Sequence, residues 1–185
     1  MYYKVNGGFS CDRQSKYDYT ASTVSYIGEL YKNQDVTIVF KEFDSEGNLV
    51  EFDSPDSSKT SRSDLVMYFN DICYVIELKE RWKQYHSNYY GKDEDNEGWM
   101  LNIEKYKELK NADGIPLYIN LYPDNVIRIW DLNKIDDYQT ITKNIHKTTV
   151  LNSDIKRQDR YQVWNRDSIE IPRIKGNPSN GIWKS

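Results

Sequence analysis

Two apolar segments separated by two turn-forming residues constrain the fold of this chain more than any other feature of its sequence. Residues 64–69 read Asp-Leu-Val-Met-Tyr-Phe and residues 72–79 read Ile-Cys-Tyr-Val-Ile-Glu-Leu-Lys, with Asn-Asp between them. Both segments are rich in β-branched and aromatic residues, which favour strands. A two-residue turn between two such segments predicts a β-hairpin, and therefore a fold that contains antiparallel strands.

The polar residues of this hairpin lie at one end of it. Side chains alternate between the two faces of a strand, so Glu77 and Lys79 should share a face. If Phe69 faces Ile72 across the turn, then Asp64 faces Glu77, and the Cβ atoms of these two residues should lie about 4.5–5.5 Å apart. Two facing carboxylates repel each other, and a divalent cation between them would remove that repulsion. A register shifted by one residue would instead turn these side chains to opposite faces.

The other elements predict an α+β fold, an α/β sandwich in which a central mixed or mainly antiparallel β-sheet is flanked by helices. Residues 1–20 show no clear period and are expected to be irregular or to form one short edge strand. Helical spacing of apolar residues predicts two helices, at 21–33 and 99–111. Further strands are expected at residues 36–43, 49–52, 117–122, 126–132, 148–151 and 168–171.

Charge divides the chain into two parts. Residues 138–185 contain nine Lys or Arg against four acids, whereas residues 1–137 contain 16 bases and 25 acids. We therefore expect a core at 1–137 and a basic C-terminal extension at 138–185 that packs on or beside it. An acidic body with a basic tail suits a carboxylate metal site beside a segment that contacts phosphate. The alternative is that the tail is simply solvated.

Composition excludes several other classes of protein. Two cysteines are too few for a disulfide framework, and no Cys/His cluster suggests zinc. The chain has no apolar stretch of about 18 residues and no signal peptide at its start, so no membrane partner is expected. The cytoplasm is the expected location.

The residue types at the end of the hairpin suit metal-dependent phosphodiester hydrolysis. Carboxylates are hard ligands that hold Mg²⁺ or Mn²⁺. The bound ion polarises the phosphorus and lowers the pKa of its water. An ammonium group beside it can offset the charge that develops on the phosphate.

Asp64, a spacer, then Glu77-Leu78-Lys79 at the end of an apolar strand, followed by a helix and two strands, resembles the PD-(D/E)xK nuclease superfamily. The resemblance covers residues 21–132, although the residue before Asp64 is Ser63 rather than Pro. It implies a restriction-endonuclease-like fold and a Mg²⁺- or Mn²⁺-dependent endonuclease that hydrolyses phosphodiester bonds in DNA, with DNA favoured over RNA. A homodimer is one arrangement that it allows.

The resemblance also implies roles for individual residues. Asp64 and Glu77 would bind the metal together with the backbone carbonyl of Leu78, and Lys79 would serve the attacking water. On the core helix, Lys105 or Asn102 would supply a further polar group. The acid that some members use as a third metal ligand matches Glu29.

Cations and aromatic residues interleave in the basic tail, a composition suited to phosphates and stacked bases. The predicted nucleic-acid contacts are Arg81, Lys83, Lys156, Arg157, Arg160 and Trp164. A competing hypothesis is a catalytically inactive protein that keeps the nuclease fold as a nucleic-acid or protein binding module.

Overall fold

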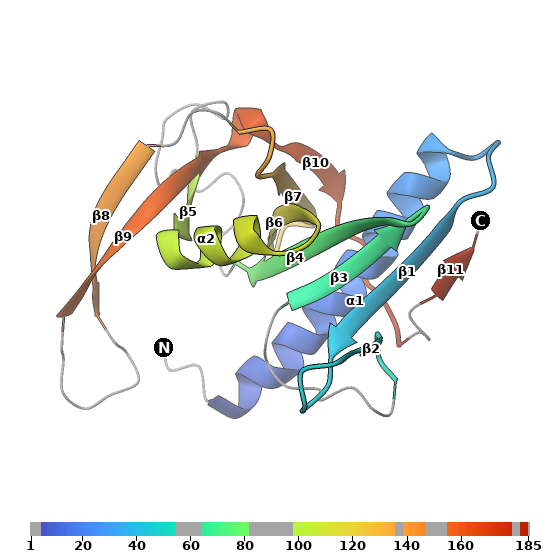
Figure 1. Ribbon diagram of the computed structural model, residues 1–185, viewed down its shortest axis with the longest axis horizontal. Coiled ribbons are helices and arrows are strands. Elements are labelled where there is room, and N and C mark those ends of the chain that lie inside the picture. The colour runs from blue at the N-terminus through green and yellow to red at the C-terminus, as the bar shows by residue number, and fades with distance from the viewer. Residues whose placement is uncertain are drawn as a thin grey trace.

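The computed structural model describes residues 5–54, 64–81, 98–135, 139–146, 155–178 and 182–184 of the 185-residue chain. Side chains are described over residues 13–54, 65–81, 101–135 and 160–178. These ranges contain two helices and two sheets, which confirm an α+β fold with a mixed sheet (Figure 1).

The main sheet has the strand order β10-β7-β6-β4-β3-β1-β11, and β2 pairs with β1 beside this path. Among the described strands, β4 and β6 form the parallel pair and their neighbours in this sheet are antiparallel. The strands are β1 (Thr37–Phe43), β2 (Leu49–Glu51), β3 (Asp64–Phe69), β4 (Ile72–Glu80), β6 (Ile115–Leu121), β7 (Val126–Asp131), β10 (Ile169–Pro172) and β11 (Ile182–Lys184).

The hairpin of β3 and β4 has the register that its two-residue turn predicts. Phe69 pairs with Ile72, and Asp64 pairs with Glu77. The turn residues Asn70 and Asp71 both have positive φ angles, 45° and 68°. Tight hairpin turns require this conformation, and Asn and Asp adopt it more readily than other residues with a side chain. The turn therefore forms without glycine.

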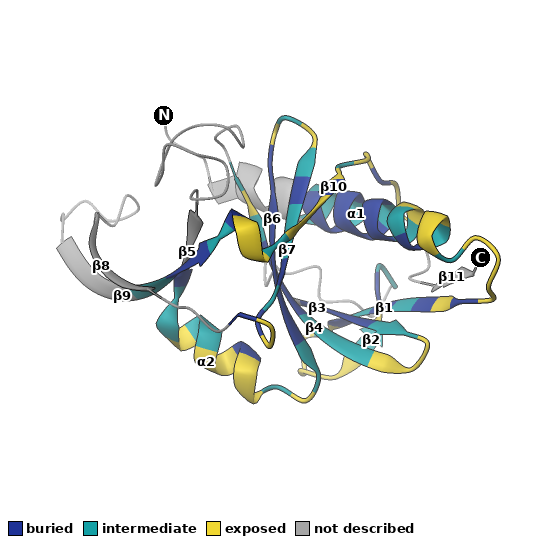
Figure 2. Ribbon diagram, turned by 90° about the horizontal axis from the view of Figure 1, so that it is seen from above, coloured by how far each residue is buried: buried dark blue, intermediate teal, exposed yellow. Residues whose placement is uncertain are grey.

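Two helices cover opposite faces of the main sheet (Figures 1 and 2). On one face, α1 (Val5–Leu30) buries Tyr19 and Ile27 in a core that includes Ile76 and Leu78 of β4. On the other face, α2 (Ile103–Asn111) buries Leu109 in a second core with Tyr118 and Trp130, which come from β6 and β7. Neither of these described helices is long and apolar enough to cross a membrane.

A smaller sheet extends from the α2 side of the molecule. Its strand order is β5-β9-β8, and both pairings are antiparallel. The strands are β5 (Gly98–Asn102), β8 (Gln139–His146) and β9 (Ile155–Trp164), and a 3₁₀ turn, η2 (Asn165–Asp167), follows β9. Val163 and Leu101, which are buried in the second core, join this sheet to α2.

Two sequence-based expectations about the helices are wrong. Residues 5–20 are helical rather than irregular. The sequence did not predict this part of α1 because its buried side carries polar residues such as Ser15, Lys16 and Asp18 and therefore shows no apolar period. Residues 98–102 form β5 rather than the start of a helix, because they pair with β9. The helix begins after Asn102, whose side chain accepts hydrogen bonds from the first turn of α2. The strand expected at 148–151 lies outside the described residues.

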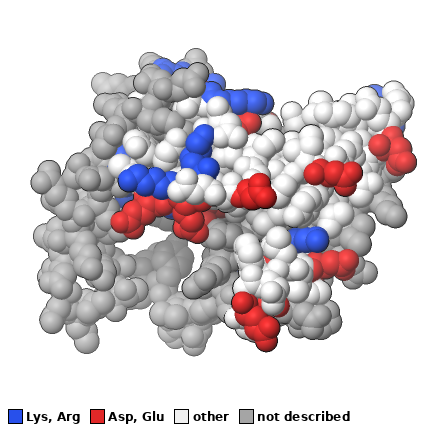
Figure 3. Space-filling view, viewed as in Figure 1, with Lys and Arg blue, Asp and Glu red and all other residues white. Residues whose placement is uncertain are grey.

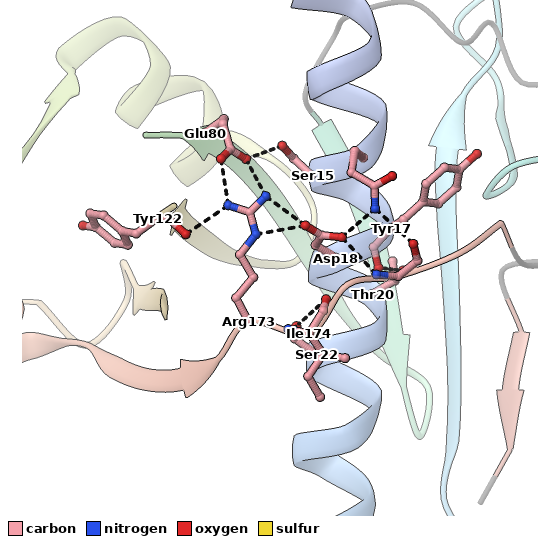
Figure 4. A network of polar contacts seen from close by, with 11 residues as sticks. Ser15, Tyr17, Asp18, Thr20, Ser22, Glu80, Tyr122, Arg173 and Ile174 are labelled. Atoms are coloured by element: carbon pink, nitrogen blue, oxygen red, sulfur yellow. Dashed lines mark hydrogen bonds and ion pairs between the residues drawn. The ribbon is translucent and has the colours of Figure 1, made fainter. Parts of the chain in front are cut away.

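A network around Arg173 connects the segment after β10 to α1 and to the end of β4 (Figure 4). The guanidinium donates to Asp18 Oδ2 at 2.9 Å, to Glu80 Oε1 at 2.7 Å and to the carbonyl oxygen of Tyr122 at 3.1 Å. Ser15 donates a further hydrogen bond to Glu80. Burial alone would lower the pKa of Arg173, but the bonds to Glu80 and Asp18 outweigh it and raise this pKa.

Gly176 lets the same segment lie directly against the helix. Its amide donates to Asp18 Oδ1 at 2.9 Å. A Cβ atom at this position would lie 2.0 Å from the carbonyl oxygen of Tyr17, which is closer than any real contact. The close approach therefore requires glycine.

A second ionic network fixes α1 to the edge of the sheet. Arg13 donates to both carboxylate oxygens of Glu42 on β1, at 2.8 and 2.6 Å, and to Asp53 after β2 at 2.6 Å. Lys16 lies 3.3 Å from the same Glu42 carboxylate. These bonds explain how a buried glutamate is tolerated under α1.

Replacement of Arg173 by methionine should destabilise the protein, because it leaves Asp18 and Glu80 without the cation that holds them together. Loss of one partner of such a partly buried network should lower the free energy of unfolding by about 2–4 kcal/mol. Urea denaturation followed by circular dichroism measures this change. Arg166→Met, at an exposed position on η2, is the control and should change the value by less than about 0.5 kcal/mol. Equal effects of the two substitutions would contradict the prediction.

Candidate functional site

A fully buried carboxylate lies between two lysines on the α2 face of the sheet. The Glu77 side chain has 0% exposure. Lys79 Nζ contacts its Oε1 atom, and Lys105 Nζ lies 3.5 Å from its Oε2 atom. The two lysine side chains are 43% and 27% exposed, so their stems lead from the solvent to the buried carboxylate. Lys105 also lies 3.0 Å from Glu108 on the same helix.

The alternation of side chains along β4 places Glu77 and Lys79 on the same face of the sheet. Glu77 and Lys79 point to the α2 side, whereas Leu78 between them packs in the core under α1. In the parallel ladder, Glu77 pairs with Tyr118 of β6, and Lys79 pairs with Asn120. The polar end of β4 therefore lies beside a part of β6 that also carries polar atoms.

A pocket of about 410 Å³ opens at this point. Its wall comes from five parts of the fold: the end of β4, the end of β5, α2, β6 and β9. Figure 3 shows Lys and Arg side chains next to acidic ones over α2 on this face. The lining residues are Glu77, Lys79, Arg81, Leu101, Asn102, Glu104, Lys105, Glu108, Tyr118 and Arg160.

Arg81 is held in the pocket wall by two neutral oxygen atoms. Its Nε atom donates to Asn120 Oδ1 at 3.0 Å, and its Nη2 atom donates to the hydroxyl of Tyr118. Its amide donates to the carbonyl oxygen of Leu121 at 2.8 Å and so continues the parallel ladder by one residue. The position of the guanidinium is thus fixed by side chain and backbone together.

Asn120 supports this arrangement from inside β6. It is fully buried in a strand whose other residues are almost all apolar. Its oxygen accepts from Arg81, and its amide nitrogen lies 3.4 Å from the hydroxyl of Tyr122. These bonds offset the cost of burying an amide among apolar groups.

The structure brings together several residues that the sequence suggested. Glu77, Lys79, Lys105, Arg81 and Arg160 all line the one pocket. The pairing of Asp64 with Glu77 is present in the ladder, and the side chain of Asp64 lies outside the described part.

Other suggested residues lie elsewhere or are not described. Glu29 is exposed near the end of α1, which covers the opposite face of the sheet. Trp164 is half-buried, and its carbonyl oxygen accepts a hydrogen bond from Trp130 Nε1 at 2.7 Å. Lys156 and Arg157 are on β9, and only their backbone is described, whereas Lys83 lies outside the described residues.

Sequence reasoning missed the residues that β6 contributes to this site. Tyr118 and Asn120 were assigned to an ordinary strand because neither belongs to a motif. A signal was present, since Asn120 is a polar residue near the end of the apolar segment Ile115–Leu121. Buried polar residues in such strands need hydrogen-bond partners, and their partners can identify a site.

The donor atoms at this site are oxygens of the kind that bind hard cations. Among the residues with described side chains, no three His, Cys, Asp or Glu side chains form a cluster that could hold a metal ion. Glu77 supplies one carboxylate to the pocket, and residue 64 is its direct partner in the ladder.

Comparison with known proteins gave no match. No protein-family model, curated protein or solved structure matches this chain. The function is therefore inferred from the geometry of the pocket.

Replacement of Asn120 by alanine should remove the acceptor for Arg81 Nε. It also removes the hydrogen bond that Asn120 makes to the hydroxyl of Tyr122. A buried hydrogen-bonding group lost in this way should lower the free energy of unfolding by about 1–3 kcal/mol. Thermal and urea unfolding measure the change. Asn133→Ala, at an exposed turn position, is the control, and an equally small effect at both positions would show that Asn120 has no supporting role.

Proposed function

We propose that this protein is a metal-dependent phosphodiesterase that cleaves nucleic acid, with DNA as the preferred substrate. The observation that carries the proposal is the buried Glu77 carboxylate at the base of a cationic pocket, with residue 64 as its ladder partner and two lysines in contact. Polar groups that converge in a pocket of this size are typical of a ligand-binding or catalytic site, which supports a functional role for Glu77.

The order of elements supports the same proposal. The β3–β4 hairpin carries the acidic residues, α2 follows on one face, and β6 returns parallel to β4. α1 covers the other face (Figure 2). This arrangement agrees with the restriction-endonuclease-like fold that the Asp64…Glu77-Leu78-Lys79 pattern implies, and we propose that the chain adopts that fold.

Each residue of the site has a chemical task in this proposal. Asp64, Glu77 and the backbone carbonyl of Leu78 would hold Mg²⁺ or Mn²⁺, which supplies an activated water and polarises the phosphate. Lys79 would orient the attacking water, because it reaches the Glu77 carboxylate from the solvent side. Lys105 would stabilise negative charge on the phosphate from the opposite side of the same carboxylate.

Cleavage of labelled DNA tests the proposal directly. Single-stranded, duplex, forked and four-way-junction DNA, together with RNA, would be incubated with Mg²⁺, Mn²⁺ or EDTA. We expect metal-dependent cleavage that Asp64→Asn, Glu77→Gln and Lys79→Met each reduce by at least about 100-fold, as for loss of other groups that stabilise a transition state.

Glu46→Gln, in the exposed turn between β1 and β2, removes one carboxylate far from the pocket and serves as the control. Cleavage that is equal in Glu46→Gln and Glu77→Gln would come from a contaminant and would contradict the proposal. Absence of cleavage with every substrate and metal, in folded protein, would favour a binding module instead.

Lys105 gives a second test that does not depend on catalysis. Its ammonium group competes with any cation for Glu77, so Lys105→Met should tighten Mn²⁺ binding by about two- to tenfold, the range for a partly exposed ion pair. Isothermal titration calorimetry at low ionic strength measures the affinity. Lys110→Met, at the exposed end of the same helix, is the matched control and should leave the Mn²⁺ affinity unchanged. Weaker Mn²⁺ binding by Lys105→Met would show that the lysine does not compete for Glu77.

A further inference from the structure

Arg81 and Arg160 are far apart in the sequence, and the fold brings them to one pocket. Arg81 directly follows β4, whereas Arg160 lies in the middle of β9 in the smaller sheet. Arg160 pairs in the ladder with Asn102, the residue that caps α2. The packing of the smaller sheet against α2 therefore determines where this arginine enters the pocket.

The guanidinium of Arg81 has a fixed orientation in the pocket wall. Its Nε atom donates to Asn120 Oδ1, and its Nη2 atom donates to the hydroxyl of Tyr118. An oriented guanidinium presents parallel N–H groups, which match the oxygens of a phosphate.

The chemistry of the pocket wall favours an anionic ligand of limited size. Four cations and three acids line it, and two of those acids, Glu77 and Glu108, are already in contact with lysines. Its volume of about 410 Å³ lies in the range of small-ligand sites. One nucleotide unit of a longer strand is an occupant of suitable size and charge.

We propose that Arg81 and Arg160 form a phosphate-binding subsite that holds the phosphodiester next to the one that is cleaved, with Tyr118 and Asn120 as positioning residues for Arg81. This inference rests on the proposed function for the identity of the ligand as a nucleic-acid strand. It adds that strand binding at this subsite does not require the metal, because none of these four residues is a proposed metal ligand.

The test is binding in EDTA, where no metal-dependent cleavage takes place. Fluorescence anisotropy would follow a labelled single-stranded oligonucleotide at several salt concentrations. We expect Arg81→Met and Arg160→Met each to weaken binding by about fivefold or more and to reduce the slope of log affinity against log salt by about one. Lys134→Met, which removes a highly exposed cation outside the pocket, is the control and should change neither quantity.

Tyr118→Phe separates positioning from charge. It removes one oxygen that holds Arg81 and keeps every charge in the pocket. It should therefore weaken binding by about two- to fivefold and leave the salt slope unchanged, since the number of phosphate contacts is the same. A changed salt slope in Tyr118→Phe would overturn its role as a positioning residue.

Oligonucleotides with one uncharged methylphosphonate provide a measurement that needs no protein variant to fold. Neutralisation of one particular phosphate should weaken binding by the wild type more than neutralisation of any other phosphate. The affinity of Arg81→Met for the oligonucleotide should not depend on whether that phosphate is neutralised. The subsite is overturned if no phosphate position stands out, or if both arginine variants bind like Lys134→Met. A third outcome is that binding depends on the two arginines but no condition gives cleavage. This outcome would overturn the proposed function and leave the subsite intact.

Discussion

The structure depends on the alternation of side chains along β4. Leu78 and Ile76 enter the core under α1, whereas Glu77 and Lys79 turn to the face that α2 covers. One strand therefore anchors the larger hydrophobic core and also supplies the polar groups of the pocket. Because the period of a strand is two residues, a register shift of one would expose the leucine and bury the lysine, so the packing of the core also fixes the chemistry of the site.

Ionic contacts hold much of α1 against the rest of the fold, a task that apolar packing performs in other helices of this length. α1 carries Arg13, Lys16 and Asp18 on its buried side, and each has an oppositely charged partner on a different element. Such pairs add little net stability compared with apolar residues, but breaking one is costly. They therefore select one position of α1 on the sheet over neighbouring positions. A uniformly apolar helix face would not make this selection.

The sequence predicted those features whose cause is local. The hairpin register followed from two turn residues and the alternation of Asp64–Lys79, and the pairing of residues 64 and 77 is present in the structure. Helix α1 was placed too short, because its first half has polar partners that only the folded chain supplies. β5 was taken for helix because its partner strand lies more than fifty residues away. Tyr118 and Asn120 belong to no sequence motif, and their role in the site follows from the hydrogen bonds that they accept from the guanidinium of Arg81.

The arrangement of the pocket has a consequence for the order in which it forms during synthesis. The β3–β4 hairpin leaves the ribosome before Arg160, which lines the pocket, and Arg173, whose network fixes the end of β4. At about 5–20 residues per second, the interval between them is on the order of ten seconds. Throughout that interval the nascent chain contains the acidic hairpin without the walls that would admit and orient a ligand. Whatever chemistry the pocket performs therefore requires that the chain has been synthesised at least as far as Arg173.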